Sequence, residues 1–135
     1  MKKAKNYRYV QSPGTTNSLG LVKFIFPNRF SVYLHDTNSR GYFDKDIRAL
    51  SSGCIRVQYP FELTEYLLDD SEKWNLKKIN ETINTKKTIQ VNFNKEIYIH
   101  ILYWTAWSEN GILQFRDDLY NYDSDLYKKL YQSSL

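Results

Sequence analysis

The stretch Arg48-Ala49-Leu50-Ser51-Ser52-Gly53-Cys54-Ile55-Arg56-Val57 contains the single cysteine of this 135-residue chain. Gly53 removes side-chain bulk directly before Cys54, so the backbone can turn tightly there and a substrate carbonyl can approach closely. The backbone N–H groups of Gly53 and Cys54 are candidate donors to a developing oxyanion. On chemistry alone, two interpretations of Cys54 stay open, because a free cysteine is either a nucleophile or a small buried apolar side chain.

A candidate base for the thiol lies upstream, in the run Val32-Tyr33-Leu34-His35-Asp36-Thr37. A free thiol is only about a few per cent ionised at neutral pH, so a nucleophilic cysteine needs a base or a cationic neighbour. Asp36 is the obvious group to orient the His35 ring, but adjacent side chains on an extended segment point to opposite faces. A backbone carbonyl is the alternative partner for the imidazole.

Four other side chains are candidates for the site, and three of them have two interpretations each. Tyr33 lies two residues before His35, on the same face of a strand, and either donates its hydroxyl into the site or packs. Arg56 is either a clamp for a substrate carboxylate or part of a surface ion pair. Arg48 adds positive charge near the cysteine. His100, within an aromatic stretch, is either a hydrogen-bonded structural histidine or a second candidate base.

The composition excludes several classes of function. The net charge is +4, and the lysines and arginines are scattered, so a nucleic-acid groove is not indicated. No apolar run reaches the roughly 18 residues of a membrane span. The first residues are basic, but no apolar stretch follows them, so they do not have the pattern of a signal peptide. One cysteine and two histidines fall short of a structural zinc site, and no metal or cofactor is expected.

The pattern of apolar residues predicts an α+β fold, mostly β, as one domain over 1–135 with 1–8 and 124–135 peripheral. Turn residues separate the elements, and Asn110-Gly111 predicts a hairpin. The Tyr and Trp residues of 98–107 are expected in the core. The loop over 36–53 is long enough to favour a functional role. Strands are predicted over 7–11, 21–26, 30–35, 88–93, 96–107 and 112–116, and helices over 60–70, 74–84 and 123–132.

Around Cys54 and His35 the sequence resembles the L,D-transpeptidase family, also called the YkuD domain. The family pattern is a histidine, a spacer, and then Ser/Thr-His-Gly-Cys followed by a hydrophobic residue. Ser52 takes the place of the second histidine, as in the large YcbB-like branch. Further segments resemble that branch and extend the similarity to about residues 9–123: 13–14, 17–20, 23–24, 27–28, 33–37, 48–51, 103–107, 115–118 and Tyr120.

The resemblance implies a thiol acyltransferase that acts on peptidoglycan stem peptides in the periplasm or cell envelope. Cys54 would attack the carbonyl before a terminal D-Ala and hold the stem as a thioester, with His35 as base and acid. An amine of a neighbouring stem would then form a 3→3 cross-link. Gly53, Cys54 and Tyr33 would hold the oxyanion, and Ser52, Arg48 and Arg56 would lie toward the substrate. Carbapenem acylation of Cys54 is also implied.

Catalytic domains of the family begin with several strands upstream of the segment that matches residue 9. We therefore expect this chain to resemble the C-terminal part of such a domain, with an exposed sheet edge through which it could self-associate. Two alternatives to transpeptidation stay open. One is an L,D-carboxypeptidase on the same site, and the other is a non-catalytic paralogue that binds cell wall.

Overall fold

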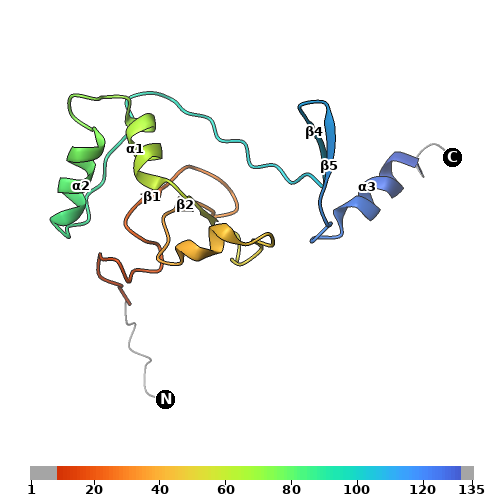
Figure 1. Cartoon of the computed structure of the whole chain (residues 1–135), viewed down its shortest axis with the longest axis horizontal. Helices are drawn as coiled ribbons and strands as arrows, with labels where there is room; N and C mark the ends of the chain where they lie inside the picture. Colours follow the sequence, from red (N-terminus) through yellow and green to blue (C-terminus); the bar gives the residue numbers. More distant parts are fainter. Residues whose placement is uncertain (1–8, 132–135) are drawn as a thin grey trace, which may run out of the picture. The chain divides into compact units, whose positions relative to one another are not determined.

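The structure is a computed structural model that describes residues 9–131. The described part of the chain divides into two compact units, with the boundary between Glu96 and Ile97. The described part contains three α-helices, one 3-10 helix and five short strands. Figure 1 shows the course of the chain with most of these elements labelled. The predicted α+β class is therefore confirmed. None of the helices within residues 9–131 is long and apolar enough to cross a membrane.

The first unit contains a three-stranded sheet in the order β1-β2-β3. β1 (Lys23–Phe24) pairs antiparallel with β2 (Leu34–His35), and β2 pairs parallel with β3 (Ile55–Arg56). The backbone N–H of Ile55 donates to the Tyr33 carbonyl at 3.1 Å, so the parallel ladder extends one residue beyond the assigned strand. The strands predicted over 21–26 and 30–35 are present but much shorter than expected.

A turn centred on Asn28 joins β1 to β2. The Asn28 side-chain amide donates to the carbonyls of Phe26 and Val32, and its Oδ1 accepts the N–H groups of Phe30 and Val32. One side chain thus satisfies four backbone groups of the turn, which is the role that asparagine commonly has in tight turns.

The connection from β2 to β3 is the long segment that the sequence predicts as a loop. It contains a 3-10 helix, η1 (Arg40–Asp44), and otherwise lacks regular structure until β3. Parallel strands cannot be joined by a short hairpin and need a crossover of about a dozen residues or more. The parallel topology therefore accounts for the length of this loop.

Two helices follow the sheet. α1 (Pro60–Leu68) begins at the proline that the sequence predicts as its start, and α2 (Leu76–Asn84) begins after Asn75, whose side chain accepts the Lys78 N–H at 2.9 Å. Both predicted helices are confirmed. The buried apolar residues of this unit come from the first strand and the two helices: Phe24, Leu68 and Ile79.

The second unit contains the hairpin of β4 (Ala106–Glu109) and β5 (Ile112–Phe115), followed by α3 (Tyr122–Tyr131). The hairpin turn is Asn110-Gly111, with φ angles of 52° and 78°, as the sequence predicts. The Tyr103 hydroxyl donates to Asp118 Oδ1 at 2.7 Å, which joins the start of the unit to the segment before α3.

Three predicted strands are wrong in whole or in part. The predicted strand over 7–11 begins outside the described residues, and 9–11 form no strand. The segments 88–93 and 96–105 are also without strand pairing, although 106–107 belong to β4. The aromatic stretch over 98–107 is not a core, because Tyr98 is 76% exposed and Trp104 is 61% exposed. These segments are rich in residues that favour strands, but within residues 9–131 no other strand pairs with them.

We predict that Gly20→Ala destabilises the protein by about 2–4 kcal/mol. Gly20 has a φ of 63°, and a Cβ at this position would overlap the carboxylate of Asp36. Urea unfolding of the two proteins measures the difference. Gly41→Ala is the matched control, because a Cβ added there would have no atom within 4 Å, and we expect a change within about 0.5 kcal/mol. Equal effects of the two substitutions would contradict the prediction.

Candidate functional site

One face of the sheet carries the residues that the sequence singles out. The pairing sets Lys23, His35 and Arg56 side by side across the three strands. Side chains two residues apart on a strand share a face, so Tyr33 lies on the face of His35, and Cys54 lies on the face of Arg56. The neighbouring row of Phe24, Leu34 and Ile55 points to the opposite face, which is the apolar one.

Cys54 lies at the entry to β3 and is half-buried. Gly53 before it has a φ of 131°, a conformation that a residue with a Cβ adopts only with strain. The Ser51 hydroxyl donates to the Cys54 carbonyl at 2.8 Å and closes the turn. Within the described residues the Cys54 N–H has no hydrogen-bond acceptor, so the geometry leaves this donor available to a ligand.

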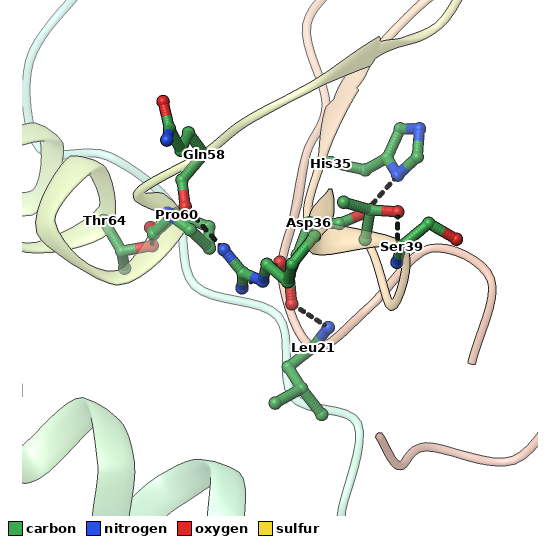
Figure 2. A network of polar contacts seen from close by, with 9 residues as sticks. Leu21, His35, Asp36, Ser39, Gln58, Pro60 and Thr64 are labelled. Atoms are coloured by element: carbon green, nitrogen blue, oxygen red, sulfur yellow. Dashed lines mark hydrogen bonds and ion pairs between the residues drawn. The ribbon is translucent and has the colours of Figure 1, made fainter. Parts of the chain in front are cut away.

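His35 is buried, with 5% of its surface exposed. Its Nδ1 forms a hydrogen bond with the backbone carbonyl of Asp36 (Figure 2). The imidazole is therefore oriented by a backbone carbonyl, which the sequence offers as the alternative to the Asp36 carboxylate. Among the described residues, no hydrogen bond joins His35 directly to Cys54.

Tyr33 contacts both of these side chains. Its ring meets the His35 ring edge-on at a centroid distance of 5.8 Å. A hydrogen bond with the Cys54 side chain, together with desolvation by burial, raises the pKa of the Tyr33 hydroxyl above 10.0. The Lys23 ammonium lies 3.7 Å from the centroid of the Tyr33 ring. Tyr33 thus stays protonated at neutral pH and is in place to donate a hydrogen bond at the thiol.

The two predicted arginines differ in their surroundings. Arg56 is half-buried, its guanidinium lies 5.2 Å from the Tyr42 ring centroid, and its buried Nε has no hydrogen-bond partner in the described part of the chain. Arg48 is exposed, and its Nε donates to the Lys45 carbonyl at 2.7 Å. No described contact brings Arg48 to Cys54. Ser52 is exposed in the turn before the cysteine.

His100 is exposed in the second unit, and no described hydrogen bond holds its ring. The expectation that it is a hydrogen-bonded structural histidine is therefore wrong. The reason is that 96–105 lacks strand pairing, so no neighbouring strand covers or bonds the imidazole. The alternative, in which His100 is a second base for Cys54, stays a prediction.

Sequence reasoning missed an ion pair beside the site that joins a buried carboxylate to an exposed arginine. The Asp36 carboxylate, in a residue that is 2% exposed, pairs with Arg40 through Oδ1 at 2.5 Å and accepts the Leu21 N–H through Oδ2 at 2.9 Å. Figure 2 shows Asp36 between Leu21 and His35. Opposite charges four residues apart were a weak signal for this pair, because the segment has no helical pattern.

A cavity of about 440 Å³ lies between η1 and the start of α1. Arg40, Phe43, Gln58 and Glu62 are among its lining residues, whereas Cys54 and His35 are not. The reactive groups therefore do not line this cavity.

Comparison with protein families matches residues 1–79 to YkuD, the L,D-transpeptidase catalytic domain. A protein of Haemophilus influenzae that carries the provisional name L,D-transpeptidase is 38% identical over 120 residues. That alignment covers 89% of this chain and 24% of the relative, so the chain spans about a quarter of the length of the curated relative.

We predict that Tyr33→Phe lowers the free energy of unfolding by about 0.5–1.5 kcal/mol at neutral pH, because the ring stays and one hydrogen bond is lost. Since the folded-state pKa of Tyr33 is raised, its contribution is present below pH 10.0 and is lost as the pH rises through the folded value. Urea unfolding of both proteins at neutral pH and at a series of pH values above 10.0 measures this loss. The exposed Tyr66→Phe is the control, and a difference that persists at the highest pH would refute the explanation.

Proposed function

We propose a thiol acyl-transfer reaction for this chain, which belongs to the L,D-transpeptidase family. In this reaction the Cys54 sulfur attacks the peptide carbonyl between the L-centre of the third stem residue and the terminal D-Ala of a peptidoglycan stem. The C–N bond breaks, D-Ala leaves as the free amine, and a thioester remains on Cys54. The observation that supports this most is the parallel register of β2 and β3, which puts Tyr33, His35, Cys54 and Arg56 on one face.

His35 is the proposed proton carrier. It takes the proton of the Cys54 thiol during attack and returns a proton to the departing amine of D-Ala. In the second half of the reaction it takes a proton from the incoming amine of a neighbouring stem, which displaces the sulfur and gives the 3→3 cross-link. Burial of the ring and its hydrogen bond to the Asp36 carbonyl support one fixed orientation for these steps.

The proposed oxyanion donors are the Cys54 N–H, the Gly53 N–H and the Tyr33 hydroxyl. The Gly53 N–H makes only a long 3.5 Å contact with Ser51 Oγ, and the Cys54 N–H has no acceptor among residues 9–131. The raised pKa of Tyr33 supports a protonated donor. Preorganised donors of this kind typically stabilise a tetrahedral intermediate by about 3 kcal/mol each.

Three residues are proposed to face the substrate. The buried Nε of Arg56 lacks a partner among the described residues, which supports a role as a clamp for the free carboxylate of D-Ala. Ser52 is exposed next to Gly53 and would lie at the edge of the stem peptide. Arg48 would add positive charge near this edge without a direct contact to the thiol.

The wider setting is also part of the proposal. As in the family, the substrate would be D-Ala-terminated tetrapeptide donors and diamino acid acceptors of the cell envelope, reached in the periplasm. Residues 1–135 would form part of one catalytic domain, with self-association through exposed strand edges. A non-catalytic, wall-binding role is the outcome if Cys54 proves unreactive.

We predict that a carbapenem acylates Cys54 and adds its intact mass to the protein under reducing conditions. Cys54→Ala removes the nucleophile and should show no adduct. His35→Ala should slow adduct formation by roughly 100- to 10,000-fold, because the thiol loses its base. Mass spectrometry with time points measures both effects. Absence of an adduct on the folded wild-type chain would contradict the proposed function.

We predict that a stem tetrapeptide yields cross-linked dimers together with free D-Ala, because an amine competes with water for the thioester. Chromatography with mass detection separates the products. Tripeptide and D-Ala without dimers would favour the L,D-carboxypeptidase alternative on the same site. The Cys54→Ala protein is the control, and it should yield neither product.

A further inference from the structure

Nearly every polar atom of Asp36, the residue after His35, takes part in a hydrogen bond or an ion pair. Its backbone N–H donates to the Val22 carbonyl at 2.8 Å, and its carboxylate accepts the Leu21 N–H at 2.9 Å and pairs with Arg40 at 2.5 Å. The remaining polar atom, the backbone carbonyl, meets Nδ1 of His35. A residue fixed at its N–H and its side chain has little freedom to rotate its own carbonyl.

The orientation of this carbonyl determines which nitrogen of His35 carries the proton. A carbonyl oxygen only accepts hydrogen bonds, so Nδ1 must be the protonated nitrogen in this contact. The lone pair of the neutral ring is then on Nε2, and this is the nitrogen that remains for the thiol. A carbonyl that turned away would remove the preference between the two tautomers.

We propose that the Asp36–Arg40 ion pair is a positioning device for His35, and that Arg40 is a positioning residue for reaction at Cys54. The proposal rests on the proposed function, in which His35 is the base. Arg40 also donates through Nη1 to the carbonyl of Gln58, which precedes α1. The ion pair therefore fixes the Asp36 carbonyl relative to the chain that leaves β3.

Stability alone is a poor reason for this pair. The Asp36 side chain is buried and the Arg40 side chain is 48% exposed, so taking the carboxylate out of water costs free energy that a partner facing solvent regains only in part. The structure nevertheless gives the carboxylate its own space, because a Cβ on Gly20 would overlap it. The buried carboxylate of Asp36 is thus better explained by its effect on the orientation of the His35 ring than by a contribution to the free energy of unfolding.

The other charged and titratable groups around His35 are distinct from this pair. Lys23 and Arg56 flank it in the sheet row, and Tyr33 lies against its ring. None of the three has a described contact with the Asp36 carboxylate. Removal of the Arg40 guanidinium should therefore loosen the orientation of the Asp36 carbonyl, while the charges of Lys23 and Arg56 stay in place.

Nitrogen-15 NMR of the full chain labelled at histidine tests the proposal without a substrate. The chain has two histidines, and the exposed His100 serves as an internal reference that His100→Gln removes for assignment. At a pH where the rings are neutral, we expect wild-type His35 to show a protonated Nδ1 and an unprotonated Nε2. Arg40→Ala and Asp36→Asn should each give a mixture of the two tautomers.

The same variants should slow carbapenem acylation of Cys54 by roughly 10- to 100-fold, because a misplaced base loses alignment. Arg40→Lys, which keeps the charge, should recover part of the rate. Lys95→Ala breaks an exposed ion pair of 2.7 Å with Asp69 in the same unit and is the matched control, with tautomer and rate unchanged.

An unchanged His35 tautomer in folded Arg40→Ala and Asp36→Asn would overturn the proposal, even if their thermal stability fell. If Arg40→Ala does not fold, the nearly isosteric Asp36→Asn decides by the same spectrum. The tautomer is read without any reaction at Cys54. An unreactive wild-type cysteine with a shifted tautomer in the variants would therefore refute the proposed function and support the positioning role.

Discussion

The parallel pairing of β2 with β3 is the constraint on which the site depends. It sets Leu34 opposite Ile55 and His35 opposite Arg56, and thereby brings Tyr33 beside Cys54. Since side chains alternate along a strand, a shift of one residue would move Cys54 and Arg56 to the apolar face. Acid–base chemistry between a thiol and an imidazole therefore needs this register, whatever substrate the face binds.

Strands of two residues contribute too few ladder bonds to hold a register alone. Side chains in the flanking segments supply the rest. Asn28 fixes the turn before β2. Asp36, the residue directly after β2, is bonded to Leu21 and Arg40. Of these groups the Asp36 carboxylate is buried, and a buried polar group that is fully bonded favours one arrangement of the chain around it. In this fold, side-chain hydrogen bonds thus supply the constraint that longer strands would otherwise provide.

The elements predicted correctly are those whose signals are local. A proline at the first turn of α1, an apolar face on α2 and the Asn110-Gly111 turn each act within a few residues. The pairing of Cys54 with His35 was predictable as chemistry and from the resemblance to a family. That these side chains lie on one face of the sheet was not predictable, because it follows from the register between strands far apart in sequence. The Asp36–Arg40 contact was missed for a different reason, because the two residues are only four apart but the segment between them has no helical pattern.

The segments 88–93 and 96–105 show why the remaining strands were wrong. Their Ile, Tyr and Trp residues favour a pleated, half-buried surface, but that preference is expressed only when a neighbouring strand completes the ladder. Within residues 9–131 no strand does so, and Tyr98 and Trp104 remain exposed. The proposed site has no such dependence. Tyr33, His35, Cys54 and Arg56 all belong to the first unit, so contacts within that unit are enough to set the geometry that the chemistry requires.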